Sequence, residues 1–479
     1  MVETSARHVH VSEADLKTLF GADAKLTVKK ELSQPGQYAS NEKVEVIGPK
    51  GSLVMSILGP TRPETQVEVA LTDARKLGIA APIRESGDLE GTPGCTLKGP
   101  AGEVVIEKGV IAAKRHIHFN VEEAAAAGVE SVKPGDIHTV ELDRLMSNDG
   151  TTHLTVDMYN NKLKNPHIAD TGKLVFIVDH NVPSDCPKTA ASQKKMRDFA
   201  KANHIDFWEG KGVCHQIMME NYVRPGELIF GADSHTCSYG ALGAFGTGVG
   251  CTDFLYGMVT GTSWVMVPET VKFNLVGKLP EGVYARDLIL TIIGEVGANG
   301  CNYQVMEFTG EGAKTLTISD RIALCNMAVE AGAKTGIFEV DDVAMEYLKE
   351  HGREPKAVYH SDPDAHYVRE YTFDLSKVEP VVAKPDFVDN LAPAKDVRGI
   401  KIDEAFLGSC NNGRIEDLRV GAQVIKGKKV SEKVRFLVVP ASQTIYRQAL
   451  EEGLIDIFMD AGAIVMNPNC SVCWGSCQG

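Results

Sequence analysis

Three cysteines near the end of the sequence have the type and spacing of metal ligands. Cys470 and Cys473 form a Cys-x-x-Cys pair in "NPNCSVCWG", a spacing that brings two thiolates onto one metal centre. Two thiolates rarely satisfy such a centre. Cys410 in "LGSCNNGRIEDLR" is the best third ligand, because it lies where a predicted strand turns into a helix, whose positive N-terminus favours a thiolate. Three cysteines on a [4Fe–4S] cube would leave one iron free to act as a Lewis acid.

Other interpretations of these cysteines stay open. The pair could be a redox dithiol or a pair of zinc ligands, and Cys477 could supply a fourth ligand to a fully coordinated cluster. A single residue such as Cys410 is more often a small buried side chain than a ligand. The spacing therefore indicates a thiolate centre without fixing its metal.

Carboxylates and imidazoles stand side by side after several apolar runs. Asp179 and His180 follow "LVFIV", and "GADSHT" supplies Asp233 and His235. His215 lies in "GVCHQIMMENY". A carboxylate beside an imidazole orients the ring and tunes its proton affinity. Any one of these histidines would more often be structural, but several of them, each close to a predicted strand, favour proton-transfer chemistry.

Two His-x-His pairs form a second group of candidate ligands. Residues i and i+2 of a strand face the same side, so His8 with His10, and His116 with His118, can each present two imidazoles to one metal. One such pair is as often a coincidence on a strand surface, whereas two copies favour metal binding. Between the pairs, "GPTRPETQVEVALTD" supplies Arg62, a planar fork suited to phosphate, and Glu68, an oxygen ligand.

The elements that must position these residues change in type along the chain. Up to about residue 130, short β-branched runs are interrupted by Gly, Pro and Asn, which predicts small antiparallel barrels with little helix. After about residue 143, strands alternate with helices, which predicts a parallel sheet in an α/β layer fold. We therefore predict a multidomain chain with regions 1–135 and 136–479, joined between about residues 130 and 143.

Composition excludes several classes of function. The chain has 479 residues, 43% of them hydrophobic, which predicts a soluble globular protein. Its net charge of -14 argues against binding to the phosphates of nucleic acid. No apolar export signal and no membrane-length apolar run are visible. Eleven cysteines without such a signal indicate reduced thiols and metal ligands rather than disulfides, and we expect a cytoplasmic location.

The first region resembles the PduL-type phosphate propanoyltransferase family. The resemblance lies in "SARHVHVSEADL", "KKELSQPGQYAS", "GPTRPETQVEVALTD", "ESGDLEGTPG" and "AAKRHIHF", which follow one another in the family's order. It implies paired β-barrels, present here as an incomplete small barrel, that move an acyl group between coenzyme A and phosphate. It also implies zinc at two sites and a phosphate site, with His8, His10 and Glu68 on one zinc, His116 and His118 on the other, and Arg62 on the phosphate. A further zinc-ligand histidine of the family is not found, so we expect the second zinc site to be incomplete.

The second region resembles the large subunit of 3-isopropylmalate dehydratase and its aconitase relatives. The matching runs include "LMSNDGTTH", "VDHNVPS", "GADSHTCSYGALGAFGTGVG", "YQVMEFTG", "LCNMAVEAGAKTGIFE", "GSCNNGRIEDLR" and "NPNCSVCWG". The resemblance implies three-layer α/β domains with parallel sheets, and reversible loss and addition of water on a hydroxy dicarboxylic or tricarboxylic acid. It implies that a [4Fe–4S] cluster is bound by Cys410, Cys470 and Cys473. It further implies the hydrogen-bonded pairs Asp179 with His180, Asp233 with His215 and Glu307 with His235, and substrate contacts from Asn148 and Ser234.

The resemblance also implies a partner. The family's proton-abstracting serine lies in a swivelling domain or separate small subunit, so we expect such a subunit as a partner, with hydroxy acid, acyl-CoA and phosphate as small-molecule substrates. The carboxylate-gripping arginine segment that follows the second cluster cysteine in the family is not found, and we expect a chain cut just beyond its cluster. Three alternatives stay open: a hydro-lyase with an inert N-terminal scaffold, a cluster-bearing sensor or binding protein without catalysis, and a fused or truncated product with neither activity.

Overall fold

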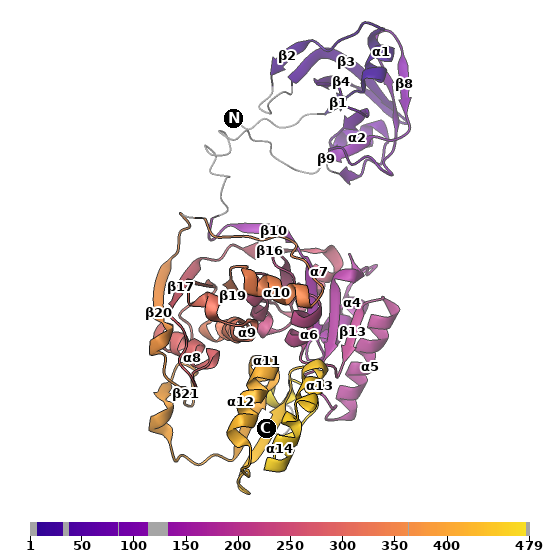
Figure 1. The fold of residues 1–479 in the computed structure, drawn as a ribbon. Coiled ribbons are helices and arrows are strands. Elements are labelled where there is room, and N and C mark those ends of the chain that lie inside the picture. The colour runs from indigo at the N-terminus through magenta and orange to yellow at the C-terminus, as the bar shows by residue number, and fades with distance from the viewer. Residues whose placement is uncertain (1–6, 32–37, 85, 114–132, 363, 476–479) are drawn as a thin grey trace. The chain divides into compact units, whose positions relative to one another are not determined.

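The chain forms two compact units, Met1–Val132 and Lys133–Gly479. The computed structural model describes residues 7–31, 38–84, 86–113, 133–362 and 364–475 (Figure 1). His116 and His118 lie outside these described residues, and so does Cys477. Each unit has its own hydrophobic core, and each is described separately below.

A single mixed sheet makes up most of the N-terminal unit. Its strands follow the order β6-β9-β5-β1-β4-β3-β7-β8, with β2 paired to β3. The core on its inner side includes Val9, Val46, Ile57 and Leu97, each fully buried. The elements are β1 (His8–His10), α1 (Glu13–Phe20), β2 (Val28–Glu31), β3 (Tyr38–Gly48), β4 (Gly51–Gly59), β5 (Gln66–Glu68), α2 (Leu71–Leu77), β6 (Ile83–Arg84), β7 (Cys95–Lys98), β8 (Glu103–Ile106) and β9 (Val110–Ala113).

The pairing of these strands corrects one expectation from the sequence. The short runs predicted antiparallel barrels, but β1 pairs with β4 in parallel, and β9 pairs in parallel with both β5 and β6. Parallel pairing needs a crossover rather than a hairpin. Here α1 follows β1 and α2 follows β5, so the chain crosses back before the next strand pairs. Turn residues signal where a strand ends, but not which neighbour it finds.

The second unit contains the predicted parallel sheets. Its principal sheet is fully parallel, with the order β13-β12-β11-β14-β15. A second parallel sheet has the order β19-β18-β17-β20, and a third the order β23-β24-β25. The strands of the three sheets are β11 (Arg144–Asn148), β12 (Leu174–Val178), β13 (Asp206–Glu209), β14 (Leu228–Gly231), β15 (Phe245–Gly248), β17 (Thr270–Val276), β18 (Val305–Thr309), β19 (Thr335–Phe338), β20 (Arg369–Asp374), β23 (Glu404–Gly408), β24 (Arg435–Val439) and β25 (Ile464–Val465).

Alternating side chains bury both faces of the principal sheet. In β12, "LVFIV", all five residues are buried. Phe176 packs into one core cluster with Phe199 of α5 and Phe254 of α7, whereas Val175 and Ile177 belong to another cluster. A strand that is covered on both faces has a continuous apolar sequence, and the run "LVFIV" predicted this strand for that reason.

Helices cover the faces of these sheets, and the shorter strands pair at their margins (Figure 1). The two remaining pairings are β10 (Ile137–Glu141) with β16 (Thr262–Met266), and β21 (Val381–Ala383) with β22 (Leu391–Pro393). The helices are α4 (Thr152–Lys162), α5 (Pro187–Ala202), α6 (Cys214–Asn221), α7 (Cys251–Thr260), α8 (Ala285–Val296), α9 (Ile318–Asn326), α10 (Asp342–Glu350), α11 (Ser409–Asn412), α12 (Ile415–Ile425), α13 (Gln443–Glu451), α14 (Leu454–Ala461) and α15 (Ser471–Trp474). Short 3-10 helices are η1 (Thr171–Lys173), η2 (Ser234–Leu242), η3 (Ala313–Thr315), η4 (Met327–Ala331), η5 (Leu375–Lys377) and η6 (Ala394–Val397).

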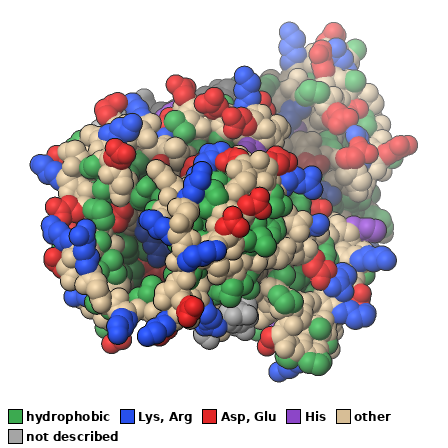
Figure 2. Space-filling model, turned by 60° about the horizontal axis from the view of Figure 1, so that its bottom comes forward, with side chains coloured by type: hydrophobic (Ala, Val, Ile, Leu, Met, Phe, Trp, Pro, Cys, Tyr) green, Lys and Arg blue, Asp and Glu red, His purple; other side chains and the backbone are tan. Residues whose placement is uncertain are grey.

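The surface in Figure 2 carries charges of both signs. Lys and Arg side chains are interspersed with Asp and Glu over this face, so it presents no continuous basic stripe of the kind that binds a phosphate backbone. Within the described part of the chain, none of the helices combines the length and the apolar content that crossing a membrane requires.

Candidate active site

The order in which the chain adds strands to the principal sheet reverses next to β11, and polar residues gather there. From β11 the strand order runs to β12 and β13 on one side, and to β14 and β15 on the other. Carboxyl ends of parallel strands on either side of such a switch leave a crevice in which ligands bind. Asn148 ends β11, Asp179 follows β12 and Asp233 follows β14. The topology therefore brings together three residues that lie far apart in the sequence.

His180 lies between two carboxylates. Its Nδ1 is 2.9 Å from Asp179 Oδ1, and its Nε2 is 3.3 Å from Asp233 Oδ2. Burial disfavours the charged ring, but the two carboxylates, Asp179 foremost, outweigh burial and raise the pKa of His180 to about 11. The ring therefore carries a proton on each nitrogen at neutral pH.

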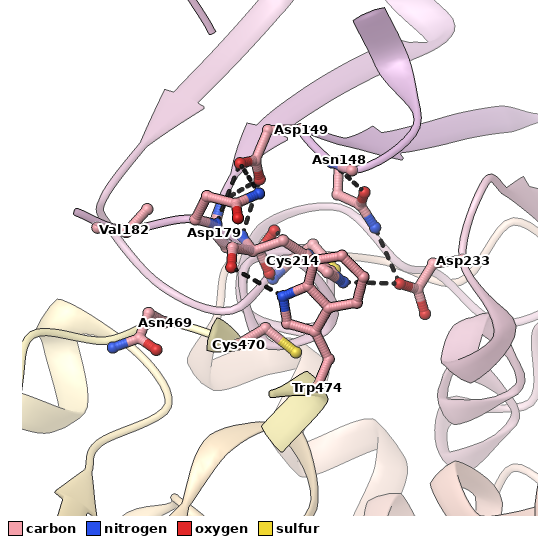
Figure 3. A network of polar contacts seen from close by, with 12 residues as sticks. Asn148, Asp149, Asp179, Val182, Cys214, Asp233, Asn469, Cys470 and Trp474 are labelled. Atoms are coloured by element: carbon pink, nitrogen blue, oxygen red, sulfur yellow. Dashed lines mark hydrogen bonds and ion pairs between the residues drawn. The ribbon is translucent and has the colours of Figure 1, made fainter. Parts of the chain in front are cut away.

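Asp233 contacts more of these polar residues than its neighbours do, and we call the group of Asp179, His180, His215 and Asp233 the acid–base layer. Its Oδ1 lies 2.8 Å from His215 Nε2 and accepts the backbone N–H of His235 at 2.9 Å. Its Oδ2 accepts the Asn148 amide N–H at 2.8 Å (Figure 3). Burial would raise the pKa of Asp233, but His215 and His180 lower it well below its ordinary value. The carboxylate therefore stays ionised and orients two imidazoles at once.

The structure corrects the third expected pair. His235 Nε2 lies 3.7 Å from Glu330 Oε1, whereas Glu307 accepts hydrogen bonds from Ser361 Oγ and Tyr367 Oη, each at 2.9 Å. The reason is the two-residue period of strand β18, in which Phe308 points into the core and Glu307 therefore points to the opposite face. Glu330, on η4, is the acidic partner of His235.

Glu330 could have been found from the sequence. It lies in "LCNMAVEAGAKTGIFE", a run that carries the resemblance, but it follows no strand and so did not fit the strand-end pattern. The contact with His235 is the main effect that lowers the pKa of Glu330. Among the three imidazoles, the side chain of His235 is 30% exposed, compared with 11% for His180 and 4% for His215. His235 is thus the ring most open to an incoming molecule, and the exposed Ser234 precedes it.

A buried carboxylate fixes the turn that carries Asp179 and His180. Asp149 Oδ1 accepts the backbone N–H groups of Asp179 and His180 at 3.0 and 2.8 Å. Its Oδ2 accepts the backbone and side-chain N–H of Asn181 at 3.1 and 3.2 Å, and the Gln193 amide at 3.0 Å. Figure 3 shows Asp149 directly against this turn. This role was not anticipated from the sequence, because most of the groups that Asp149 accepts are backbone N–H groups, which every residue type offers.

The backbone of the turn before Cys410 is strained. Gly408 has φ +150°, and a Cβ there would meet Val439 O at 2.2 Å, so only glycine fits between β23 and α11. Ser409 also has a positive φ, of 63°, which is uncommon for a residue with a side chain. This sharp turn presents Cys410 at the carboxyl end of β23, as the sequence predicted.

The thiols of Cys410 and Cys470 lie in one buried cluster with Val213. Cys470 follows β25, and its backbone N–H donates to Asp179 O at 2.8 Å, which joins the thiols to the acid–base layer. Cys473 is one helical turn further on, on α15, with an exposed surface. Burial, followed by the neighbouring Cys473, raises the pKa of the Cys410 thiol to about 12. Buried thiols with raised pKa values need a bound cation to become thiolates.

Among the described residues, Cys410, Cys470 and Cys473 do not form the compact set of ligand atoms that a single ion requires. The described residues contain three sets of ligand atoms that lie within 4.8 Å of one another, and none of the three combines Cys410, Cys470 and Cys473. In a cubane each cysteine binds a different iron, so its sulfurs stand further apart than the ligands of one ion. Cys214, a further buried thiol beside Asp179, was not anticipated from the sequence.

The N-terminal unit holds a separate group of candidate ligands. His8 pairs with Glu68 across β1 and β5, with His8 Nε2 3.4 Å from Glu68 Oε2, and His10 completes a buried set within 4.8 Å. Burial, followed by the charges of Arg62 and His8, lowers the pKa of His10 to about 3. A neutral imidazole is the form that binds a metal. Arg62 Nη1 donates to Ser86 Oγ at 2.9 Å, and Ser86 in turn donates to Glu68 at 2.8 Å.

Comparisons with known proteins assign the family. The sequence profile of the aconitase family (aconitate hydratase) matches residues 120–479, and that of phosphate propanoyltransferase matches residues 1–158. An α/β unit with acid–base groups and cysteines at its strand ends thus coincides with the first match. The chain belongs to the aconitase family, and it carries a phosphate propanoyltransferase domain at its N-terminus.

The sequences of three named relatives agree with this assignment. The chain is 46% identical to the 3-isopropylmalate dehydratase large subunit of Hydrogenobaculum sp. (strain Y04AAS1), over 74% of this chain and 84% of that protein. It is 47% identical to the same-named subunit of Acetivibrio thermocellus (74% and 85%), and 46% identical to a probable methanogen homoaconitase large subunit of Methanothermobacter thermautotrophicus (74% and 85%). A crystal structure of Thermococcus kodakaraensis aconitase X covers 73% of this chain and 83% of its own, with a TM-score of 0.45 and 13% identity.

Replacing Asp149 tests whether its carboxylate anchors the 179–181 turn. We expect Asp149→Asn to lower the free energy of unfolding by about 3 kcal/mol, because buried N–H donors lose their acceptor. Urea unfolding measures this change. Asp170→Asn is the matched control, because Asp170 also accepts a backbone N–H but is exposed. Equal stability of the two variants would contradict the anchoring role.

The charge of His180 predicts a pH dependence of stability. Because its folded-state pKa of about 11 lies above the ordinary value of 6.5, the protonated ring stabilises the fold fully below about pH 6.5, and the contribution is lost as the pH rises through about 11. We expect His180→Gln to be less stable than the wild type by roughly 2 kcal/mol at pH 6, with a difference that shrinks toward pH 11. Urea midpoints of the two proteins across this range measure it, with the exposed His351→Gln as control. A difference that grows with pH would contradict the assignment.

Proposed function

We propose that residues 136–479 form a [4Fe–4S]-dependent hydro-lyase that reversibly dehydrates 3-isopropylmalate or a related hydroxy di- or tricarboxylic acid. The observation that carries this proposal is the hydrogen bond between Cys470 N and Asp179 O, which sets two buried thiols directly against two Asp–His pairs. Hydration chemistry needs both groups at once: an electrophile for the hydroxyl and a fixed proton source. The identity of about 46% to dehydratase large subunits supports the substrate class.

Cys410, Cys470 and Cys473 are the residues that would hold the cluster. When bound, its open iron supplies Lewis-acid polarisation of the substrate hydroxyl. Two of these thiols are buried, and the exposed surface of Cys473 marks the open side. A donor set of three thiolates suits a cluster with a free corner.

His180 is the proposed proton source for the departing hydroxyl. Its Nδ1–H, at 2.9 Å from Asp179, fixes the ring, whereas its Nε2–H faces Asp233 at the longer distance of 3.3 Å. The longer contact is the weaker of the two, so a substrate oxygen in the ring plane can replace Asp233 as the acceptor of the Nε2 proton. Asp233 then orients His215 and balances the charge of the ring.

Ser234, His235 and Glu330 form the proposed substrate-facing edge. Ser234 Oγ lies 3.4 Å from His235 Nδ1, so the two side chains present one polar surface. Asn148 is buried, with its amide N–H on Asp233 and its Oδ1 accepting Gly150 N–H. In this arrangement Asn148 contributes by orienting Asp233, and a direct contact with the substrate would require its amide to turn.

A small subunit is the proposed partner of this region. The named relatives are large subunits, and the family's proton-abstracting serine is expected on a separate swivelling domain. His180 and His235 supply acid and orienting groups, but abstraction of the carbon-bound proton calls for a base on the opposite face of the substrate. We therefore propose that turnover requires the partner.

For the N-terminal unit we propose a zinc-dependent phosphate acyltransferase that converts acyl-CoA and phosphate into acyl phosphate and coenzyme A. His8, His10 and Glu68 are the proposed ligands of one zinc, and their buried, mixed imidazole and carboxylate set suits that metal. Arg62, half-buried and linked through Ser86 to Glu68, is the proposed phosphate-binding residue. The second zinc site at His116 and His118 stays a prediction from the sequence.

Cysteine variants test the hydro-lyase proposal. After anaerobic reconstitution we expect about four irons per chain and a broad absorbance around 400 nm. Cys410→Ser and Cys470→Ser should lose both, and should lose 3-isopropylmalate dehydration by at least about 100-fold when a small subunit is supplied. The exposed Cys186→Ser is the matched control and should keep both properties. Full iron content in the Cys410 and Cys470 variants would refute the proposal, whereas wild-type protein with a cluster and no turnover would indicate a binding protein.

Zinc content tests the N-terminal site independently. We expect Glu68→Gln and His10→Ala to lose about one zinc per chain, measured by elemental analysis after dialysis against excess metal. His167→Ala, at an exposed position, should retain it. The loss should abolish acyl-CoA phosphorolysis while dehydration continues. Retention of the zinc in both ligand variants would contradict the assigned ligands.

A further inference from the structure

Arg286 places a positive charge beside the cysteine site. It lies in the first turn of α8, and its side chain is exposed. Its Nη1 donates to Asn411 Oδ1 at 2.7 Å and more weakly to Asn412 Oδ1 at 3.4 Å. Both asparagines belong to α11, immediately after Cys410. The guanidinium is therefore held against the segment that presents a proposed cluster ligand.

The asparagine that holds Arg286 is itself fixed. Asn411 Nδ2 donates to Asn326 Oδ1 at 3.0 Å and to Ala323 O at 3.3 Å. These two hydrogen bonds to α9 hold the Asn411 side chain in place. A guanidinium that is held by a fixed amide is pre-organised, and binding a ligand costs it little conformational entropy. Its remaining N–H groups point away from the two amide oxygens because of its fork geometry.

Arg286 shares an electrostatic environment with the acid–base residues. The charges of Arg286, Glu330, His180 and Asp233 all act on Cys473. Arg286 also lowers the pKa of Glu330, in addition to the larger effect of His235. The thiol that marks the open side thus lies among the proposed proton-transfer groups and this arginine.

The charge of Arg286 is not neutralised by a carboxylate. In the described part of the chain it forms no ion pair with Asp or Glu, and its side-chain hydrogen bonds go to neutral amides. The other arginines nearby are committed elsewhere. Arg414 is buried and donates to three backbone carbonyls, and Arg321 is buried against Asp341. Arg286 is therefore an exposed cation without a carboxylate partner that is available to an anion entering beside Cys473.

Resting on the proposed hydro-lyase function, we propose that the Arg286 guanidinium binds a carboxylate of the hydroxy-acid substrate and so selects substrates with more than one carboxylate. A planar fork can donate two parallel hydrogen bonds to a carboxylate, which fixes the orientation of the acid as well as its position. The substrate would then extend from the open corner of the cluster site, beside Cys473, to α8. Arg286 would set specificity, because it meets the end of the acid that does not react.

Affinity for an unreactive polycarboxylate tests this inference. The cluster-reconstituted full chain is titrated calorimetrically with propane-1,2,3-tricarboxylate, with wild type, Arg286→Gln and Arg286→Lys compared. We expect binding to weaken at least about 10-fold in Arg286→Gln and by less in Arg286→Lys, which keeps the charge but not the fork. Arg419→Gln is the matched control, because Arg419 is an exposed arginine on α12 paired with Glu452, and its affinity should equal that of the wild type.

Three further readouts separate substrate binding from a purely structural contact between α8 and α11. In steady-state dehydration with a small subunit supplied, Arg286→Gln should raise KM at least about 10-fold with little change in kcat. Its iron content and thermal midpoint should match the wild type. Unchanged affinity and KM, or a fall in iron content and thermal midpoint with KM unchanged, would overturn the inference. The proposed function fails separately, through the Cys410 and Cys470 variants.

Discussion

One backbone hydrogen bond, from Cys470 N to Asp179 O, joins the two halves of the candidate site. Cys470 follows a strand of the third sheet and Asp179 a strand of the principal sheet, so this contact sets the distance between thiols and imidazoles. Trp474 supports it by donating from Nε1 to His180 O at 3.1 Å, and Val213 N donates to Ala441 O at 2.9 Å. If these contacts were lost, the principal sheet and the third sheet would each stay folded, but the thiols would no longer face the Asp–His pairs.

The sequence predicts the architecture of the second unit well, because its strands are buried on both faces. A run such as "LVFIV" at β12 is typical of a parallel strand that is covered on both faces, and residues that follow such strands lie at one edge of the sheet. The sequence analysis placed Asp179, His180 and Asp233 after predicted strands, and this geometry is what brings them together. In the first unit, short runs located the strands, but parallel pairing of β1 with β4 depends on crossovers that local patterns do not encode.

The residues that sequence reasoning missed act without a strand-end signal. Glu330 reaches His235 from a 3-10 helix, and Arg286 comes from the first turn of a helix. Asp149 is the exception, because it directly follows β11 and was missed for another reason: several of its partners are backbone N–H groups, which every residue type offers. The error at Glu307 has the same origin. Its run resembles the family, but a strand points alternate residues to opposite faces, and only the fold shows that Phe308 takes the inward position. The overlap of the two family matches over residues 120–158 also explains why no sharp join could be read from the sequence.

The central claim is that three thiols hold a cluster with one corner open to a hydroxy acid. Mössbauer spectroscopy of iron-57-reconstituted wild-type chain, with and without propane-1,2,3-tricarboxylate, tests it most directly. We expect one iron in four to change its spectrum when the acid is added, while the spectra of the other three stay the same. Four equivalent irons that are unaffected by the acid, or no cluster at all, would contradict it.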